Sequence, residues 1–268
     1  MKLINPCNKD DLSITSLGFG CARIDKKGRE NFLIDECLSH KINHFDTAQQ
    51  YGTENALGAA LQGVINVTIS TKIGLYPDDE AESYAKKIYR FYGKKILSHT
   101  PTLKRSLLKA INKYNTRKKS SYSINNDKHL KNITRDWVDS HIVDSLNNLN
   151  RDYIDFLLLH EPSQFSLNDS VNEIFSDLTS NKLIRAYGFG LTHLEQDFDF
   201  GDIILTNWKE TLSQSSKIHL LHGFLRDNHV SMLEKIILKK NQGLLFSAST
   251  SRQIREVAYY YRRNIFIK

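Results

Sequence analysis

Short runs of β-branched and other apolar residues alternate with amphipathic stretches of helical length along most of the chain. This alternation is typical of repeated strand–helix units that build a parallel sheet. Eight runs are predicted to be strands, at residues 13–20, 42–46, 65–72, 153–160, 184–190, 202–207, 217–223 and 243–249. A stretch long enough for a helix follows each of them.

Two of these stretches carry clear helix signals. Thr53 and Glu54 open a run that places Leu57 and Leu61 on one face. Residues 168–178 repeat apolar side chains at helical spacing. Both helices are predicted to pack against the sheet.

Parallel strands joined by helices need right-handed crossovers, and eight consecutive units close most naturally into a (β/α)8 TIM barrel. The pattern leaves an open, doubly wound sheet as the alternative. In a barrel the active site lies at the C-terminal ends of the strands, so polar residues there are the first candidates for chemistry.

The interval from about residue 77 to 134 separates the third strand from its expected helix and is far longer than a usual strand–helix connection. We interpret residues 1–268 as a single barrel domain with an insertion at about 77–134 and a short C-terminal tail. Residues 86–135 hold 15 Lys and Arg and a single acid, so the rest of the chain has a net charge of −7 although the whole carries +7.

Aromatic residues lie between the basic ones of this insertion, a pattern that nucleic-acid-binding segments also show. We favour a solvated helical excursion, or a lid that attracts an anionic or carrier-bound carbonyl substrate, and expect no nucleic-acid partner.

The composition is that of a globular protein: 268 residues, 40% of them hydrophobic, permit a sizeable core and exclude disordered and collagen-like chains. The three cysteines, Cys7, Cys21 and Cys37, show no CxxC spacing, which argues against a disulfide scaffold or a zinc site and favours a reducing compartment. The N-terminus lacks the apolar core of a signal peptide, and no run approaches the ~18 apolar residues of a membrane span. We therefore expect a cytoplasmic protein without a membrane partner.

Polar side chains end three of the predicted strands: Asp46, Lys72 and His160. Any one of them alone is more simply read as an ordinary charged residue at a strand exit. Tyr51 follows Asp46 by five residues, near enough to share a site. A nearby ammonium such as Lys72 is expected to stabilise the phenolate and lower the pKa of Tyr51, while Asp46 keeps Lys72 charged.

Together the four residues suit carbonyl reduction, because they can hydrogen-bond a carbonyl oxygen and protonate it. Such a site needs a hydride donor. Without a flavin or metal motif, nicotinamide is the natural choice.

The sequence resembles the aldo-keto reductase family over about residues 16–258. The shared elements appear in order as LGFG, INHFDTAQQYGTENALGAAL, STKIG, DSLNNLNRDYIDFLLLHEPS, YGFG and SASTSRQIRE. The resemblance implies a barrel enzyme that reduces aldehydes and ketones with NADPH or NADH and needs no metal. It also implies Tyr51 as general acid, Lys72 and Asp46 as partners that tune its pKa, and His160 as the group that orients the carbonyl.

The resemblance further implies a set of cofactor contacts. These are Gly20 and Cys21 after the first strand, Trp208 as an aromatic that stacks on nicotinamide, Phe224 and Arg226 after the seventh strand, and Ser247, Ser249, Arg252, Gln253 and Glu256 around the last helix. Because Arg252 and Arg255 could meet a 2′-phosphate, we favour NADPH, with NADH as the alternative.

Some positions depart from the family pattern. Gly190 and Leu191 stand where the family usually has the Ser-Asn pair that holds the carboxamide, and Val257 replaces a frequent Asn. The alternative function is therefore a nucleotide-binding regulatory subunit with little or no catalysis. His219 and His222 form an HxxH pair whose rings should face opposite sides of a strand, which argues against a shared metal. The sequence specifies neither the carbonyl substrate nor the oligomeric state.

Overall fold

The computed structural model of the chain describes residues 3–4, 14–24, 28, 30–74, 133–162, 167–194, 198–210, 216–239 and 241–266. They belong to one compact unit formed by residues 1–74 and 133–268. The predicted insertion at 77–134 lies outside the described residues, apart from its last two positions.

Eight parallel strands form a closed barrel in which each strand pairs with the next and β10 pairs with β3. The strands are β3 (Leu17–Gly20), β4 (His44–Asp46), β5 (Thr68–Ile73), β6 (Ile154–His160), β7 (Ile184–Leu191), β8 (Ile203–Asn207), β9 (Ile218–His222) and β10 (Gln242–Phe246). The predicted (β/α)8 barrel is thus confirmed, and the open sheet is not formed.

The predicted strand at residues 13–20 is in fact two elements. Residues Ile14–Thr15 form β2, which pairs antiparallel with β1 (Leu3–Ile4), and β3 begins only at Leu17. The polar pair Thr15 and Ser16 separates the apolar residues Ile14 and Leu17, whose spacing of three does not fit one face of a single strand. This break in the alternation was the available signal that the chain leaves one sheet and enters another.

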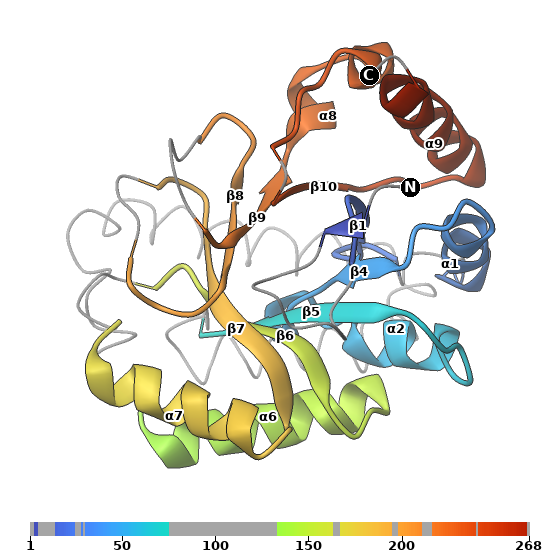
Figure 1. Ribbon diagram of the computed structural model, residues 1–268. Helices are drawn as coiled ribbons and strands as arrows, with labels where there is room; N and C mark the ends of the chain where they lie inside the picture. Colours follow the sequence, from blue (N-terminus) through green and yellow to red (C-terminus); the bar gives the residue numbers. More distant parts are fainter. Residues whose placement is uncertain are drawn as a thin grey trace, which may run out of the picture. The chain divides into compact units, whose positions relative to one another are not determined.

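The helices include α1 (Glu30–Ser39), α2 (Glu54–Ala60), α6 (Arg135–Leu149), α7 (Asp169–Ser180) and α9 (Ser251–Phe266), which lie outside the strands (Figure 1). Both helices with clear signals are present. The side chain of Asn168 caps α7 by accepting a hydrogen bond from the Val171 N–H at 3.1 Å. Leu57 and Leu61 are buried, as predicted.

A helix after every strand was expected, and here the expectation is wrong in part. In the described stretches 192–194, 198–202, 208–210 and 216–217, no α-helix follows β7 or β8. After β9 there are only α8 (Phe224–Asp227) and the 3₁₀ helix η5 (Val230–Glu234). Only 11 residues separate β7 from β8 and only 10 separate β8 from β9, which is near the shortest connection that can join parallel strands.

The interior of the barrel is apolar on one side and polar on the other. Strands β6 to β10 contribute one apolar cluster, of Phe156, Leu158, Ala186, Ile203, Leu205, Ile218, Leu220 and Leu245. Residues two apart in a strand share a face, which identifies the inward positions of β4 and β5. These inward positions are polar. They are His44, Asp46, Thr68, Ser70 and Lys72, all buried.

Candidate active site

The four residues proposed for chemistry converge on one cavity of about 470 Å³ at the C-terminal ends of the strands. Asp46 ends β4, Lys72 lies near the end of β5, and His160 ends β6. Tyr51 closes the 3₁₀ helix η1 (Gln49–Tyr51) that follows β4. Three strands and one connection therefore bring together groups that are up to 114 positions apart in the sequence.

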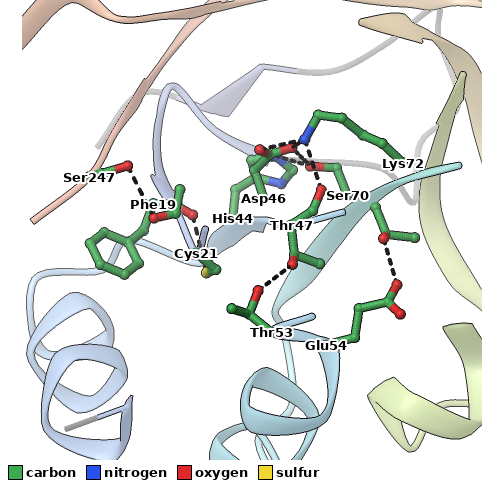
Figure 2. Close-up of polar contacts among 12 residues, drawn as sticks. Phe19, Cys21, His44, Asp46, Thr47, Thr53, Glu54, Ser70, Lys72 and Ser247 are labelled. Atoms are coloured by element: carbon green, nitrogen blue, oxygen red, sulfur yellow. Dashed lines mark hydrogen bonds and ion pairs between the residues drawn. The ribbon is translucent and has the colours of Figure 1, made fainter. Parts of the chain in front are cut away.

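Lys72 and Asp46 form a buried ion pair. The ammonium Nζ lies 2.7 Å from each carboxylate oxygen and 2.8 Å from the Thr47 carbonyl oxygen (Figure 2). Because an ammonium has three protons, every one of them has an acceptor. The side chains of Lys72 and Asp46 are only 2% and 9% exposed, so the pair is hardly screened by water.

Burial raises the pKa of the Tyr51 phenol well above its usual value, and the charges of Asp46 and Glu161 raise it further. The predicted lowering of the Tyr51 pKa is therefore wrong as a net effect, because burial and the two carboxylates outweigh the stabilisation of the phenolate by Lys72. Lys72 directs its protons to Asp46 and Thr47, and its Nζ lies 5.4 Å from the centre of the Tyr51 ring. The phenol stays protonated through neutral pH.

His160 packs edge-on against Tyr51, with ring centres 5.9 Å apart and an interplanar angle of 89°. Burial lowers the pKa of His160 to about 4, and the positive charge of Lys72 adds to this effect. The imidazole is thus neutral at physiological pH. Its Nδ1 atom is buried and has no hydrogen-bond partner within the described part of the chain.

A second polar network supports the connection that carries Tyr51. Gln49 donates to the Ser145 hydroxyl of α6 at 2.8 Å, and Ser145 donates to the Glu54 carboxylate at 2.8 Å. Glu54 also accepts from Thr71 of β5 at 2.7 Å. The network ties both sides of Tyr51 to the barrel and to α6, and the sequence analysis did not identify it.

The predicted cofactor contacts divide into two groups. Gly20, Arg226, Ser247 and Ser249 line the cavity together with the four proposed catalytic residues. The lining formed by the described residues does not include the others, which are Cys21, Trp208, Phe224, Arg252, Gln253 and Glu256.

The side chains of this second group have other partners. Cys21 is fully buried, and its Sγ lies 3.5 Å from the Phe19 carbonyl oxygen (Figure 2). Trp208 packs edge-on against Phe224 with ring centres 5.2 Å apart and donates to Asp227 at 3.1 Å. Trp208 therefore packs against α8, and neither Trp208 nor Phe224 is part of the cavity lining.

The start of α9 is organised by its own side chains. Gln253 accepts from the Ser249 N–H at 2.8 Å, while the Gln253 N–H donates to the Thr250 hydroxyl at 3.3 Å, an arrangement close to a capping box. Arg252 pairs with Glu256 one turn along the helix at 3.0 Å. Arg255 pairs with Glu36 of α1 at 2.9 Å.

The sequence analysis missed several residues that line the cavity: Arg23, Glu161, Thr192 and, apart from its place in the HxxH pair, His222. Glu161 directly follows His160 and adopts a left-handed conformation with φ 52°. One of its carboxylate oxygens accepts from the Thr192 N–H at 2.9 Å and the Thr192 hydroxyl at 2.5 Å. The available signal was position, since Arg23 and Glu161 both lie just beyond a strand end.

Comparison with known proteins agrees with this geometry. The family model for the Aldo/keto reductase family matches residues 16–197, and the chain belongs to this family of oxidoreductases. No curated protein sequence matches the chain. No helix among the described residues is long and apolar enough to cross a lipid bilayer.

Solved structures share the fold at low sequence identity. The holo form of the aldo-keto reductase AKR11C1 from Bacillus halodurans is 17% identical with a TM-score of 0.64, and the match covers 100% of this chain and 95% of that one. The aldose reductase from Schistosoma japonicum is 12% identical with a TM-score of 0.60, over 96% and 87% of the two chains. The glycerol dehydrogenase AKR11B4 from Gluconobacter oxydans is 19% identical with a TM-score of 0.56, over 88% and 66%.

Proposed function

We propose that this protein reduces an aldehyde or ketone to an alcohol with NADPH, with Tyr51 as the general acid. The observation that carries the proposal is the convergence of Tyr51, His160 and the Lys72–Asp46 pair on one cavity at the strand ends. An acid, a neutral hydrogen-bond donor and a buried ion pair around one space form a site for protonating a carbonyl oxygen.

The cavity suits a nicotinamide dinucleotide. Glycines at positions 20, 190 and 223 line it without a side chain. A Cβ atom at Gly20 would lie only 2.8 Å from the Ser247 hydroxyl, so a side chain there would crowd the cavity. Arg23 and Arg226 also line the cavity, and guanidinium groups bind phosphate well.

NADPH is favoured over NADH because Arg252 and Arg255 open α9 near Ser249, which lines the cavity. Both arginines are paired with carboxylates, and a 2′-phosphate would compete for them. The bound cofactor would supply a hydride to the carbonyl carbon.

The chain's own residues then supply the proton and the orientation. His160 is neutral, so one ring nitrogen carries a proton that it can donate to the carbonyl oxygen as a hydrogen bond. A carbonyl oxygen that gains negative charge becomes more basic than the phenolate. The phenolic proton of Tyr51 then moves to that oxygen, and Tyr51 later regains a proton from water.

The ion pair has a separate role in this scheme. The Lys72 ammonium, 5.4 Å from the Tyr51 ring centre, stabilises the phenolate that forms during the step. The raised pKa of Tyr51 keeps the phenol protonated until the carbonyl oxygen becomes the stronger base.

The test is NADPH oxidation by purified protein with a panel of aldehydes and ketones, compared with the Tyr51→Phe variant. We expect Tyr51→Phe to lower kcat at least about 100-fold, within the range of general acid catalysis, while NADPH binding measured by fluorescence is unchanged. A variant as fast as the parent would show that Tyr51 is not the acid. Tight NADPH binding with no turnover on any carbonyl compound would favour a regulatory subunit.

A further inference from the structure

We propose that Ser70 and His44 are positioning residues, which hold the Asp46 carboxylate in the orientation that receives Lys72. The inference rests on the proposed function, because the reaction gives this orientation its purpose. Both residues lie below the site, at inward positions of β5 and β4.

A hydrogen-bond chain runs from the site into the barrel interior. The Ser70 hydroxyl donates to Asp46 Oδ1 at 2.6 Å, and its oxygen lies 3.4 Å from His44 Nε2. The other ring nitrogen, Nδ1, lies 2.9 Å from the Thr68 hydroxyl. Figure 2 shows the imidazole of His44 beside the Asp46 carboxylate and the Ser70 hydroxyl. Strand register explains the contacts, since His44 pairs with Thr68 and Asp46 with Ser70.

The direction of each bond follows from proton counting. Ser70 has one proton and gives it to Asp46, so its oxygen can only accept from His44. His44 must therefore carry its proton on Nε2, which leaves Nδ1 to accept from Thr68 at 2.9 Å. The single Thr68 hydroxyl proton then goes to this nearer acceptor and not to the Asn43 carbonyl oxygen, which lies 3.5 Å away. Every donor in the chain then points toward the Asp46 carboxylate.

The neutral state of His44 keeps these directions in place. The side chain is fully buried, and this burial lowers the pKa of His44 to about 4. The charged groups around it are Asp46, which raises the pKa, and Lys72, which lowers it. His44 therefore carries a single ring proton at physiological pH.

The barrel makes room for this imidazole where an apolar side chain is usual. A Cβ at Gly18 on the neighbouring strand β3 would lie 2.8 Å from His44 Cδ2 and 2.6 Å from Leu245 Cδ2. The ring also packs against Phe156 on β6, with centres 5.6 Å apart. A polar ring enclosed in this way is costly unless both nitrogens are bonded, and here both are.

The consequence for the reaction concerns Lys72. Asp46 takes two of the three Lys72 protons, so its orientation decides where the ammonium lies relative to Tyr51. Without the Ser70 proton, Oδ1 loses a charge-assisted bond that fixes the carboxylate against β5, and the carboxylate is free to rotate together with Lys72. The ammonium would move with it, and the phenolate of Tyr51 would lose its stabilising charge.

The first experiment compares Ser70→Ala and His44→Leu with the parent in single-turnover hydride transfer from NADPH. We expect Ser70→Ala to lower the rate about 10- to 100-fold, the range of a hydrogen bond to a charged group, with the Kd for NADPH changed less than about twofold. His44→Leu should have a smaller effect in the same direction. Ser140→Ala, which removes a hydroxyl on the exposed face of α6, is the matched control and should match the parent.

A double-mutant cycle with Asp46→Asn separates positioning from general destabilisation. If Ser70 acts through Asp46, adding Ser70→Ala to Asp46→Asn should lower the single-turnover rate less than about threefold further. An undiminished second loss, or a Ser70→Ala rate equal to that of the parent, would overturn the inference.

Nitrogen-15 NMR of the parent protein, labelled at histidine, tests the chain without any catalysis. The inference requires His44 to carry its proton on Nε2 at neutral pH, and a proton on Nδ1 would refute it even if Ser70→Ala fails to fold. If Tyr51→Phe retains activity while His44 shows the expected tautomer, Tyr51 is not the acid and the hydrogen-bond chain stands; if the parent reduces no carbonyl compound while His44 shows that tautomer, the proposed function fails and the chain still stands. If Tyr51→Phe is inactive and Ser70→Ala is not impaired, only the positioning role fails.

Discussion

Removing the ammonium of the buried ion pair should destabilise the fold strongly. Lys72→Met keeps the length and much of the apolar stem of the side chain but leaves Asp46 without a cation. Asp46 is 6% exposed and would retain the Ser70 proton as its main charge-assisted bond. An anion confined in this way has little water to compensate it.

The magnitude follows from the geometry. Lys72 contributes two bonds of 2.7 Å to Asp46 and one of 2.8 Å to the Thr47 carbonyl. Breaking a buried pair from one side costs about 3–5 kcal/mol. Since a domain is stable by only about 5–15 kcal/mol, Lys72→Met should remove a large share of the stability.

Urea denaturation at pH 7 measures this loss, with circular dichroism and tryptophan fluorescence as independent probes. The matched variant is Lys72→Met with Asp46→Asn, which removes both charges and should recover more than half of the loss. A loss below about 1 kcal/mol for Lys72→Met, the value of an exposed pair, would refute the buried geometry.

Two further results are expected. His44 has a pKa of about 4 in the folded chain and about 6.5 when unfolded, so between these pH values the unfolded chain binds more protons. The stability therefore falls by up to about 1.4 kcal/mol per pH unit as the pH drops. His44→Leu should flatten the dependence of urea midpoints on pH, and an unchanged slope would contradict the burial of a neutral imidazole. Glu161 raises the pKa of Tyr51, so Glu161→Gln should lower that pKa. Ultraviolet titration measures it when the curve of a Tyr51→Phe variant is subtracted to leave the signal of Tyr51. An unchanged curve for Glu161→Gln would mean that the two groups do not interact.

The strand pattern was sufficient to predict the barrel and the four convergent side chains. Alternation places Asp46 and Lys72 on inward faces, and strand ends share one rim, so proximity follows from position alone. The same rule could have identified His44, which precedes Asp46 by two residues and must share its face.

Contacts that depend on side-chain direction could not be predicted in this way. Trp208 lies one residue beyond β8, and whether it faces the cavity or Phe224 is decided by the packing of α8. The pKa of Tyr51 could not be predicted either. Spacing places Lys72 near the phenol, but only the three-dimensional structure shows that the ammonium protons of Lys72 go to Asp46 and Thr47.

The uneven interior of the barrel has a consequence for how the chain can change. Volume-conserving hydrophobic exchanges should be tolerated at Leu158, Ile203, Ile218 and Leu220, which belong to the apolar cluster and do not line the cavity. The inward positions of β4 and β5 lack that freedom, because each side chain there is hydrogen-bonded to the next. Random libraries screened for soluble expression should therefore accumulate substitutions at the inward positions of β6 to β10 and leave those of β4 and β5 nearly invariant.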